Sequence, residues 1–236
     1  MSNAIKNQTP PPVSEKVADF ATQNSTLKPR PTMAQVTFSK SLLEPGTKVL
    51  IFGDSWAQGY AATPISRGFA YLIGETFGWD AEVVHRGGTG YTNPGPQDVG
   101  TYAQSIAALQ EDPTMQLVMI QGGLNDIYGG KSTDVATAAS AAWAAAQERF
   151  PNAQIVVLGP AQSTKNIQTV LREIDGNLRM AADHASLPYI SPINEVWINA
   201  QNYDDVFNVE AFHPDTDGHA YFAKRLEEDI RTLATK

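Results

Sequence analysis

The chain has 236 residues, of which 42% are hydrophobic, and this is enough for one compact domain with a real core. Its formal net charge of −8 argues against nucleic acids and anionic membranes as partners, because both are themselves negatively charged. The absence of cysteine excludes disulfides, thiolate catalysis and cysteine metal ligands.

The N-terminal 45 residues differ in character from the rest of the chain. They are polar and interrupted by proline, and only residues 14–24 space their apolar side chains as a helix does. We predict a linker or an arm lying on the domain for residues 1–45, and a single folded domain for residues 46–236. No signal peptide is visible, and no apolar run reaches the roughly 18–20 residues of a membrane span. We expect a soluble protein of open localisation, secreted or at the cell surface if an N-terminal signal has been removed.

Short apolar runs alternate with longer amphipathic segments over the rest of the chain. The expected strands are rich in Val and Ile and read as buried on both faces; they are Lys48–Phe52, Glu82–His85, Met115–Gln121, Gln154–Leu158 and Pro188–Ile190. The expected helices are Arg67–Phe77, Asp134–Arg149, Ile167–Ala181 and Gly218–Leu233. This alternation predicts an α/β fold with a parallel sheet of about five strands and helices on both faces. Functional side chains are expected at the carboxyl ends of the strands.

The first expected strand leads into Gly53-Asp54-Ser55-Trp56. A serine at a strand-to-helix turn lies near a helix N-terminus, where free N–H groups and the helix dipole favour negative charge. A serine hydroxyl becomes a useful nucleophile only beside a base. Since most serines in such turns only cap the next helix, both interpretations of Ser55 are open at this point.

Two further loops follow expected strands. Residues 87–90 read Gly-Gly-Thr-Gly, which either exposes N–H groups to a ligand or forms an ordinary tight turn; the full phosphate-loop pattern is absent. After the third strand, Gly122–Asp126 carries Asn125. Its amide could donate to an oxyanion, or the segment could be a plain Asn–Asp turn.

Near the C-terminus, Glu210 stands three residues before His213. On a tight loop this spacing lets an acid orient an imidazole, as a catalytic base requires. The alternative is a metal site built from His213, His219 and the acids around them. The spacing of the two histidines fits no helical ligand motif, so we expect no metal and no cofactor.

Taken in order, these segments resemble the sequence blocks of the SGNH hydrolases, also called GDSL esterases. The blocks are Gly53-Asp54-Ser55, the loop Gly87–Gly90, Gly123-Leu124-Asn125-Asp126 and Glu210-Ala211-Phe212-His213. One block alone is a weak signal, whereas all of them in order between residues 48 and 236 are specific. The resemblance implies a flavodoxin-like three-layer α/β/α sandwich that hydrolyses ester or thioester bonds, with residues 46–236 as the catalytic domain.

The resemblance also implies roles for single residues. By position in the blocks, Ser55 becomes the nucleophile, His213 its general base and Glu210 the acid that orients the base. The oxyanion hole becomes the N–H groups of Ser55 and Gly90 together with the side-chain amide of Asn125.

Two positions depart from the family pattern. The family usually carries Asp where Glu210 stands, so the longer side chain puts the contact with the histidine in question, and Asp204 or Asp205 could substitute. His85 occupies a place that is often Asn; we expect a simple loop residue there, and a role in shaping the pocket is the alternative.

Aromatic side chains flank the expected site. Trp56, Tyr60 and Tyr91 are candidates for an apolar or sugar-stacking wall, although aromatic residues are more often part of a core. We expect an acyl-enzyme on Ser55, formed from a short acyl or acetyl ester of a small molecule or carbohydrate, with transfer to water or to another alcohol. The alternative is a non-catalytic sugar- or nucleotide-binding module on the same fold.

Overall fold

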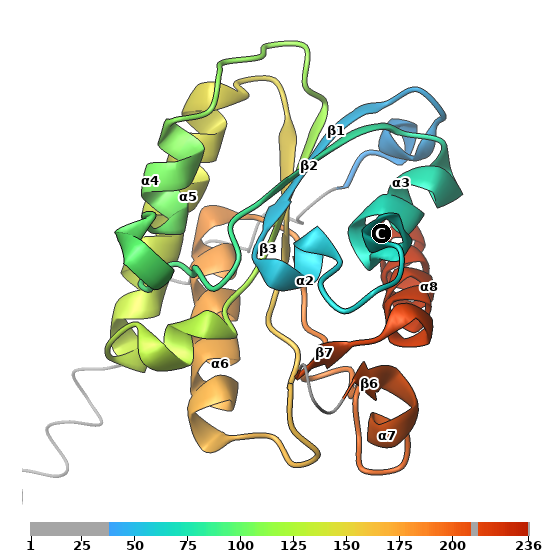
Figure 1. Ribbon diagram of the computed structural model, residues 1–236. Coiled ribbons are helices and arrows are strands. Elements are labelled where there is room, and N and C mark those ends of the chain that lie inside the picture. Colours follow the sequence, from blue (N-terminus) through green and yellow to red (C-terminus); the bar gives the residue numbers. More distant parts are fainter. Residues whose placement is uncertain (1–37, 209–211, 236) are drawn as a thin grey trace, which may run out of the picture. The chain divides into compact units, whose positions relative to one another are not determined.

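The structure, a computed structural model, describes residues 38–208 and 212–235. Its main sheet has five parallel strands in the order β2-β1-β3-β4-β5, as expected from the sequence (Figure 1). The strands are β1 (Lys48–Gly53), β2 (Asp80–His85), β3 (Leu117–Gln121), β4 (Gln154–Leu158) and β5 (Tyr189–Ile190). Because the chain runs from β1 outward to β2 and then returns to β3 on the other side, the strand order reverses beside β1. In open parallel sheets such a reversal opens a crevice at the carboxyl ends of the strands.

Helices cover both faces of this sheet (Figure 1). The α-helices are α2 (Ser55–Gln58), α3 (Phe69–Phe77), α4 (Tyr102–Ala107), α5 (Val135–Arg149), α6 (Thr169–Ala185), α7 (Tyr203–Val206) and α8 (Thr216–Leu233). Single 3-10 turns lie at Lys40–Leu43, Ile65–Arg67, Pro96–Asp98, Asn125–Tyr128 and Ser132–Asp134. Helices α3 and α8 form one layer, and α4, α5 and α6 form the other. The three-layer α/β/α sandwich is thereby confirmed, and no helix among the described residues combines the length and apolar character needed to cross a bilayer.

Two apolar clusters hold the layers together. One joins the α3–α8 layer to the sheet through side chains such as Ile73, Phe222 and Ile51. The other joins the α4–α5–α6 layer through Trp143 and Phe52. Side chains of β1 thus point alternately into the two clusters, which explains why this strand reads as continuously apolar.

The structure departs from the expected elements at β2 and α4. Strand β2 is an edge strand, and Asp80, Ala81 and Glu82 are exposed, so the prediction of burial on both faces is wrong there. Helix α4 was not expected, because it is too short to show a helical period; a capping box between Thr101 and Gln104 starts it. The helix expected at residues 14–24 lies outside the described residues.

The end of the segment assigned to the arm packs onto the domain. Phe38 and Leu42 are buried in the α3–α8 cluster. The Leu42 carbonyl also accepts a hydrogen bond of 2.8 Å from the indole N–H of Trp79. The apolar core therefore includes residues from Phe38 onward.

A small hairpin carries the chain from α7 into the last helix. Strands β6 (Phe207–Asn208) and β7 (His213–Pro214) pair antiparallel, and the backbone N–H of Asp215 donates to the carbonyl of Val206 over 3.1 Å. Asp215 then caps α8, accepting from the Gly218 N–H at 2.9 Å. The position of His213 is therefore set by α7 and by the start of α8.

Candidate active site

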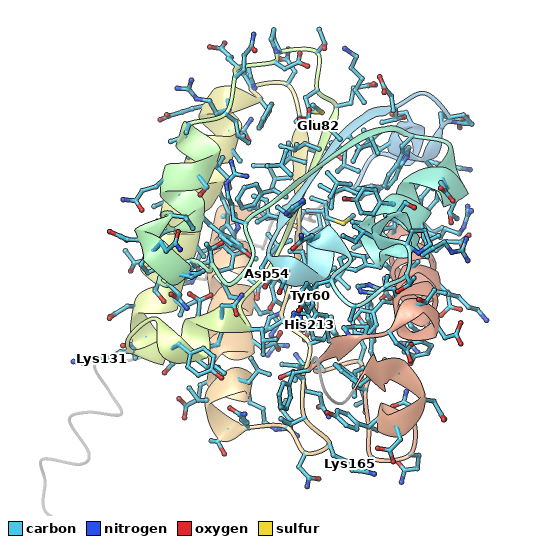
Figure 2. The ribbon with its side chains drawn as sticks, in the orientation of Figure 1. Asp54, Tyr60, Glu82, Lys131, Lys165 and His213 are labelled. Atoms are coloured by element: carbon cyan, nitrogen blue, oxygen red, sulfur yellow. The ribbon has the colours of Figure 1, made fainter. Side chains whose placement is uncertain are left out.

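The structure brings together two side chains that lie 158 residues apart in the chain. Ser55 Oγ lies 2.7 Å from His213 Nε2, which is a hydrogen-bond distance between a hydroxyl and an imidazole. Ser55 follows β1 as the first residue of α2, and His213 lies on β7. Figure 2 shows His213 beside Tyr60, whose ring centroid is 4.7 Å from the imidazole. A serine in contact with a base is the arrangement that nucleophilic catalysis needs.

The turn before Ser55 is held by Asp54. Its carboxyl is fully buried, and Oδ1 accepts a hydrogen bond of 2.8 Å from the Trp56 N–H. The N–H of Ser55, in the first turn of α2, donates to no described residue. This N–H is therefore available to an acceptor in front of the serine.

Asn125 bridges the loops after β1 and β2. Its Nδ2 donates to Asp54 Oδ2 over 3.2 Å and to the Thr89 carbonyl over 2.9 Å. The same side chain lines the cleft in front of Ser55. Its placement on the same cleft as Ser55 agrees with the expected position, and its amide is held by two hydrogen bonds.

The glycine loop is arranged differently from the expectation. The Gly90 N–H donates to the Asn93 carbonyl at 2.8 Å, so it is not available as the oxyanion donor assigned to it. A Cβ at Gly90 would lie 2.6 Å from Asp126 Oδ2, and glycine is therefore required for close approach of that carboxylate. Gly87 and Gly88 line the cleft instead, and their N–H groups donate to no described residue.

Asp126 holds the glycine loop in place through hydrogen bonds. It is 1% exposed and accepts hydrogen bonds from the Tyr91 N–H (3.1 Å), the Thr92 N–H (2.6 Å) and the Thr92 hydroxyl (2.7 Å). This role was not expected from the sequence, although the Asn125-Asp126 pair was the available signal. Burial raises the pKa of Asp126, while these donors act against that rise.

Burial acts in the same way on Asp54. It raises the pKa of this carboxyl to about 7, and the nearby Asp126 adds to the rise. The Trp56 N–H and the Gln121 side chain act in the opposite direction. Two buried acidic groups therefore lie close to the turn that carries Ser55.

Glu210, the acid expected to orient His213, lies outside the described residues. Of the possible substitutes, Asp204 forms an ion pair of 2.7 Å with Lys165, and Asp205 is exposed on α7 with no ion pair to a described residue. Asp204 is thus engaged elsewhere.

A cleft of about 570 Å³ opens in front of the serine and histidine. Besides the residues already named, it is lined by Leu124, Ile127, Tyr128, Ser163 and Phe212. Tyr128, Phe212 and Tyr60 are 80%, 60% and 48% exposed and lie together along this cleft. They form what we call the aromatic rim: Tyr60, Tyr128 and Phe212.

The structure places the expected aromatic wall differently. Tyr91 is 1% exposed and packs on Tyr102 and Trp143 in the core, so its assignment to substrate binding is wrong. Trp56 lines the cleft but is 3% exposed, because its ring packs on Phe222 and lies near His213. Of the aromatic rim, Tyr60 was expected at the cleft, whereas Tyr128 and Phe212 were missed. They lie in a single 3-10 turn and in a turn before β7, where sequence spacing gives no orientation.

The remaining histidines take structural positions. His219 is fully buried: its Nδ1 accepts from the Phe69 N–H at 3.3 Å, and its Nε2 contacts the Tyr60 carbonyl at 3.1 Å. This fixes a neutral imidazole with the proton on Nε2, and burial lowers its pKa accordingly. His85 ends β2 opposite Gly53 and does not line the cleft. Residues 38–208 and 212–235 contain no cluster of acidic and histidine side chains suited to a metal ion.

Comparison with known proteins gives one family match. Residues 51–221 match the model of the GDSL-like Lipase/Acylhydrolase family. No curated protein sequence matched the chain.

Solved structures resemble the fold at low sequence identity. A family two carbohydrate esterase from Clostridium thermocellum aligns with a TM-score of 0.62 at 19% identity, covering 80% of this chain and 64% of its own. The carbohydrate acetylesterase Est24 from Sinorhizobium meliloti aligns at 0.61 and 12% identity, covering 79% and 99%. An aryl esterase from M. smegmatis aligns at 0.59 and 16% identity, covering 80% and 100%. The chain thus spans about two thirds of the Clostridium thermocellum protein and nearly all of the other two.

Proposed function

Because the chain belongs to the GDSL-like lipase/acylhydrolase family of carboxylic ester hydrolases, we propose that it is a serine esterase that works through an acyl-enzyme on Ser55. The observation that carries this proposal is the 2.7 Å contact between Ser55 Oγ and His213 Nε2 at the floor of an open cleft. A hydroxyl in contact with an imidazole can lose its proton as it attacks.

The first half-reaction forms the acyl-enzyme. Ser55 Oγ bonds to the ester carbonyl carbon while its proton passes to His213 Nε2. The bond from carbon to the alcohol oxygen then breaks, and His213 returns the proton to the departing alcohol. In the second half-reaction water, or another alcohol, repeats these steps and releases the acyl group. Glu210 is proposed to orient His213, as the family resemblance implies.

The negative charge on the carbonyl oxygen needs donors during both half-reactions. We assign this task to the Ser55 N–H, the Asn125 amide and the Gly87 N–H. Gly87 replaces Gly90 in this role. Gly87 lies next to Ser55, since a Cβ built on Gly87 would be 4.0 Å from the Ser55 Cβ, and its N–H donates to no described residue. The Gly90 N–H, in contrast, already donates to the Asn93 carbonyl. Each such donor is worth roughly 3–4 kcal/mol in acyl transfer.

The proposed substrate is a short acyl or acetyl ester, with a carbohydrate as its alcohol part. Exposed aromatic rings at a cleft edge suit a sugar ring, which presents an apolar C–H face. The aromatic rim and the fold shared with carbohydrate esterases support this choice. A panel of acyl chain lengths and acetylated oligosaccharides tests it: a preference for long acyl chains on simple alcohols would reject it.

Esterase activity itself is tested with p-nitrophenyl acetate. We expect Ser55→Ala and His213→Ala to lower the rate by roughly 10⁴–10⁶-fold. Ser105→Ala is the matched control, since this buried serine lies in α4 away from the cleft, and it should keep the wild-type rate. Equal background rates for wild type and Ser55→Ala would instead favour the non-catalytic sugar- or nucleotide-binding module.

A further inference from the structure

Asp54 is buried behind the nucleophile and has no assigned part in the chemistry. It cannot meet a substrate, because its carboxyl is fully covered and does not line the cleft. Burying a carboxyl costs free energy, and this cost shows in the raised pKa of Asp54. A simple helix cap could be supplied by serine or threonine at lower cost.

The two oxygens of Asp54 hold the two sides of the proposed oxyanion hole. Oδ1 accepts from the Trp56 N–H and so fixes the first turn of α2, which carries the Ser55 N–H. Oδ2 accepts from Asn125 Nδ2. One rigid, planar group therefore connects the serine turn to the amide that faces it.

The bond from Asn125 to Asp54 differs from the bond to Thr89. The Thr89 carbonyl is 2.9 Å from Nδ2, whereas Asp54 Oδ2 is 3.2 Å away. The longer bond restrains the amide while leaving its hydrogen able to be shared with a second acceptor in a three-centre bond. Without Asp54, one anchor remains, and the amide can turn about its last torsion.

We propose that Asp54 is a positioning residue. It holds the Asn125 amide in the orientation, relative to Ser55, in which the amide can donate to the oxyanion of the transition state. The inference rests on the proposed esterase function. A donor that is already oriented needs no reorganisation when charge develops, which is the source of its catalytic value. Loss of Asp54 is therefore expected to lower kcat with little change in KM, and to do so through Asn125.

A double-mutant cycle at pH 8 tests this inference. Asp54→Ser keeps an oxygen that can cap the Trp56 N–H but is too short to reach Asn125. We expect a loss in kcat of about 10-fold for Asp54→Ser and about 10²–10³-fold for Asn125→Ala. Asp54→Ser should then cost less than 3-fold further when added to Asn125→Ala.

The matched control is Asp175→Ser, which removes another buried carboxyl. Asp175 is 1% exposed, bonds to the hydroxyls of Tyr189 and Ser191, and does not line the cleft. The substitution Asp175→Ser should lower the melting temperature. It should leave kcat of the folded protein unchanged in both the wild-type and the Asn125→Ala backgrounds. If Asp54→Ser does not fold, the same cycle is measured with Asp54→Asn. This variant preserves the side-chain volume but places an amide opposite the Asn125 amide.

The outcomes separate the two proposals. If Asp54→Ser lowers kcat by the same factor in the wild-type and Asn125→Ala backgrounds, Asp54 does not act through Asn125 and the inference is overturned. An unchanged kcat in Asp54→Ser and Asp54→Asn also overturns it. If wild type and Ser55→Ala have equal rates, the esterase proposal fails instead.

Discussion

Replacing Gly218 by alanine is expected to lower the stability of the protein and to distort the proposed catalytic site. Gly218 lies in the first turn of α8, and a Cβ there would meet the carbonyl group of Val206, with the carbonyl carbon only 2.8 Å away. Restoring the ordinary contact of 3.4 Å requires α7 and α8 to separate by at least 0.6 Å (3.4 − 2.8). Overpacking of this kind costs about 1–3 kcal/mol.

The displacement reaches His213 through the backbone. The Val206 carbonyl also accepts from the Asp215 N–H, two residues after His213, and Phe207 pairs with Pro214. A shift of this carbonyl therefore moves the imidazole against Ser55 Oγ, at present 2.7 Å from Nε2. Since a misplacement of about 1 Å can cost 10²-fold in rate, we expect kcat to fall roughly 10–100-fold.

Gly176→Ala is the matched control for this substitution. Gly176 lies within α6, and a Cβ there meets nothing within 4 Å, so alanine should stabilise the helix by up to about 1 kcal/mol. Thermal unfolding and p-nitrophenyl acetate hydrolysis are measured for both variants. A melting temperature lowered by about 2–12 °C is expected for Gly218→Ala. Wild-type stability and rate in Gly218→Ala, or equal damage in Gly176→Ala, would refute the reasoning.

Two further predictions concern Asp54 and the aromatic rim. Because burial raises the Asp54 pKa from 3.8 to about 7, the folded state binds this proton more tightly than the unfolded state. The free energy of unfolding of wild type, measured relative to that of Asp54→Asn, should therefore fall as the pH rises from about 4 to about 7. The total fall should be at most about 4 kcal/mol, and the difference should stay level above pH 7. A rise of this difference over the same pH range, measured by urea titration, would contradict the prediction. Tyr128→Ala should lower kcat/KM several-fold for an acetylated oligosaccharide and leave the hydrolysis of ethyl acetate unchanged. The control, Tyr91→Phe, should change neither rate. An equal loss on both esters in Tyr128→Ala would argue against a contact between Tyr128 and the sugar.

The sheet and the long helices could be predicted from the sequence because their apolar periods are strong. Residues Gln154–Leu158 were expected as a strand and form β4 with the same bounds. The edge position of β2 could not be predicted, since Val83 and Val84 read like residues of a central strand. Strand order depends on contacts between distant segments, which local periodicity does not encode.

The residues of the proposed site could be named from the sequence, whereas their detailed geometry could not. Ser55, Asn125 and His213 follow or precede identifiable elements, and the structure places Ser55 against His213 and all three beside one cleft. The direction of a backbone N–H, as at Gly90, depends on loop conformation that residue types do not fix. The same holds for Tyr91, whose position beside the glycine loop gave no sign that its ring points into the core.

The hairpin that presents the imidazole has a consequence for synthesis of the protein. Ser55 precedes His213 by 158 residues, so the serine turn is synthesised well before β7 and α8. The segment that carries His213 is anchored by the cap of Asp215 on α8, and this anchor forms only when α8 does. The contact between Ser55 and His213, and with it the proposed hydrolysis, should therefore appear only after α8 has folded, which would make turnover a sensitive reporter of the folding of this segment.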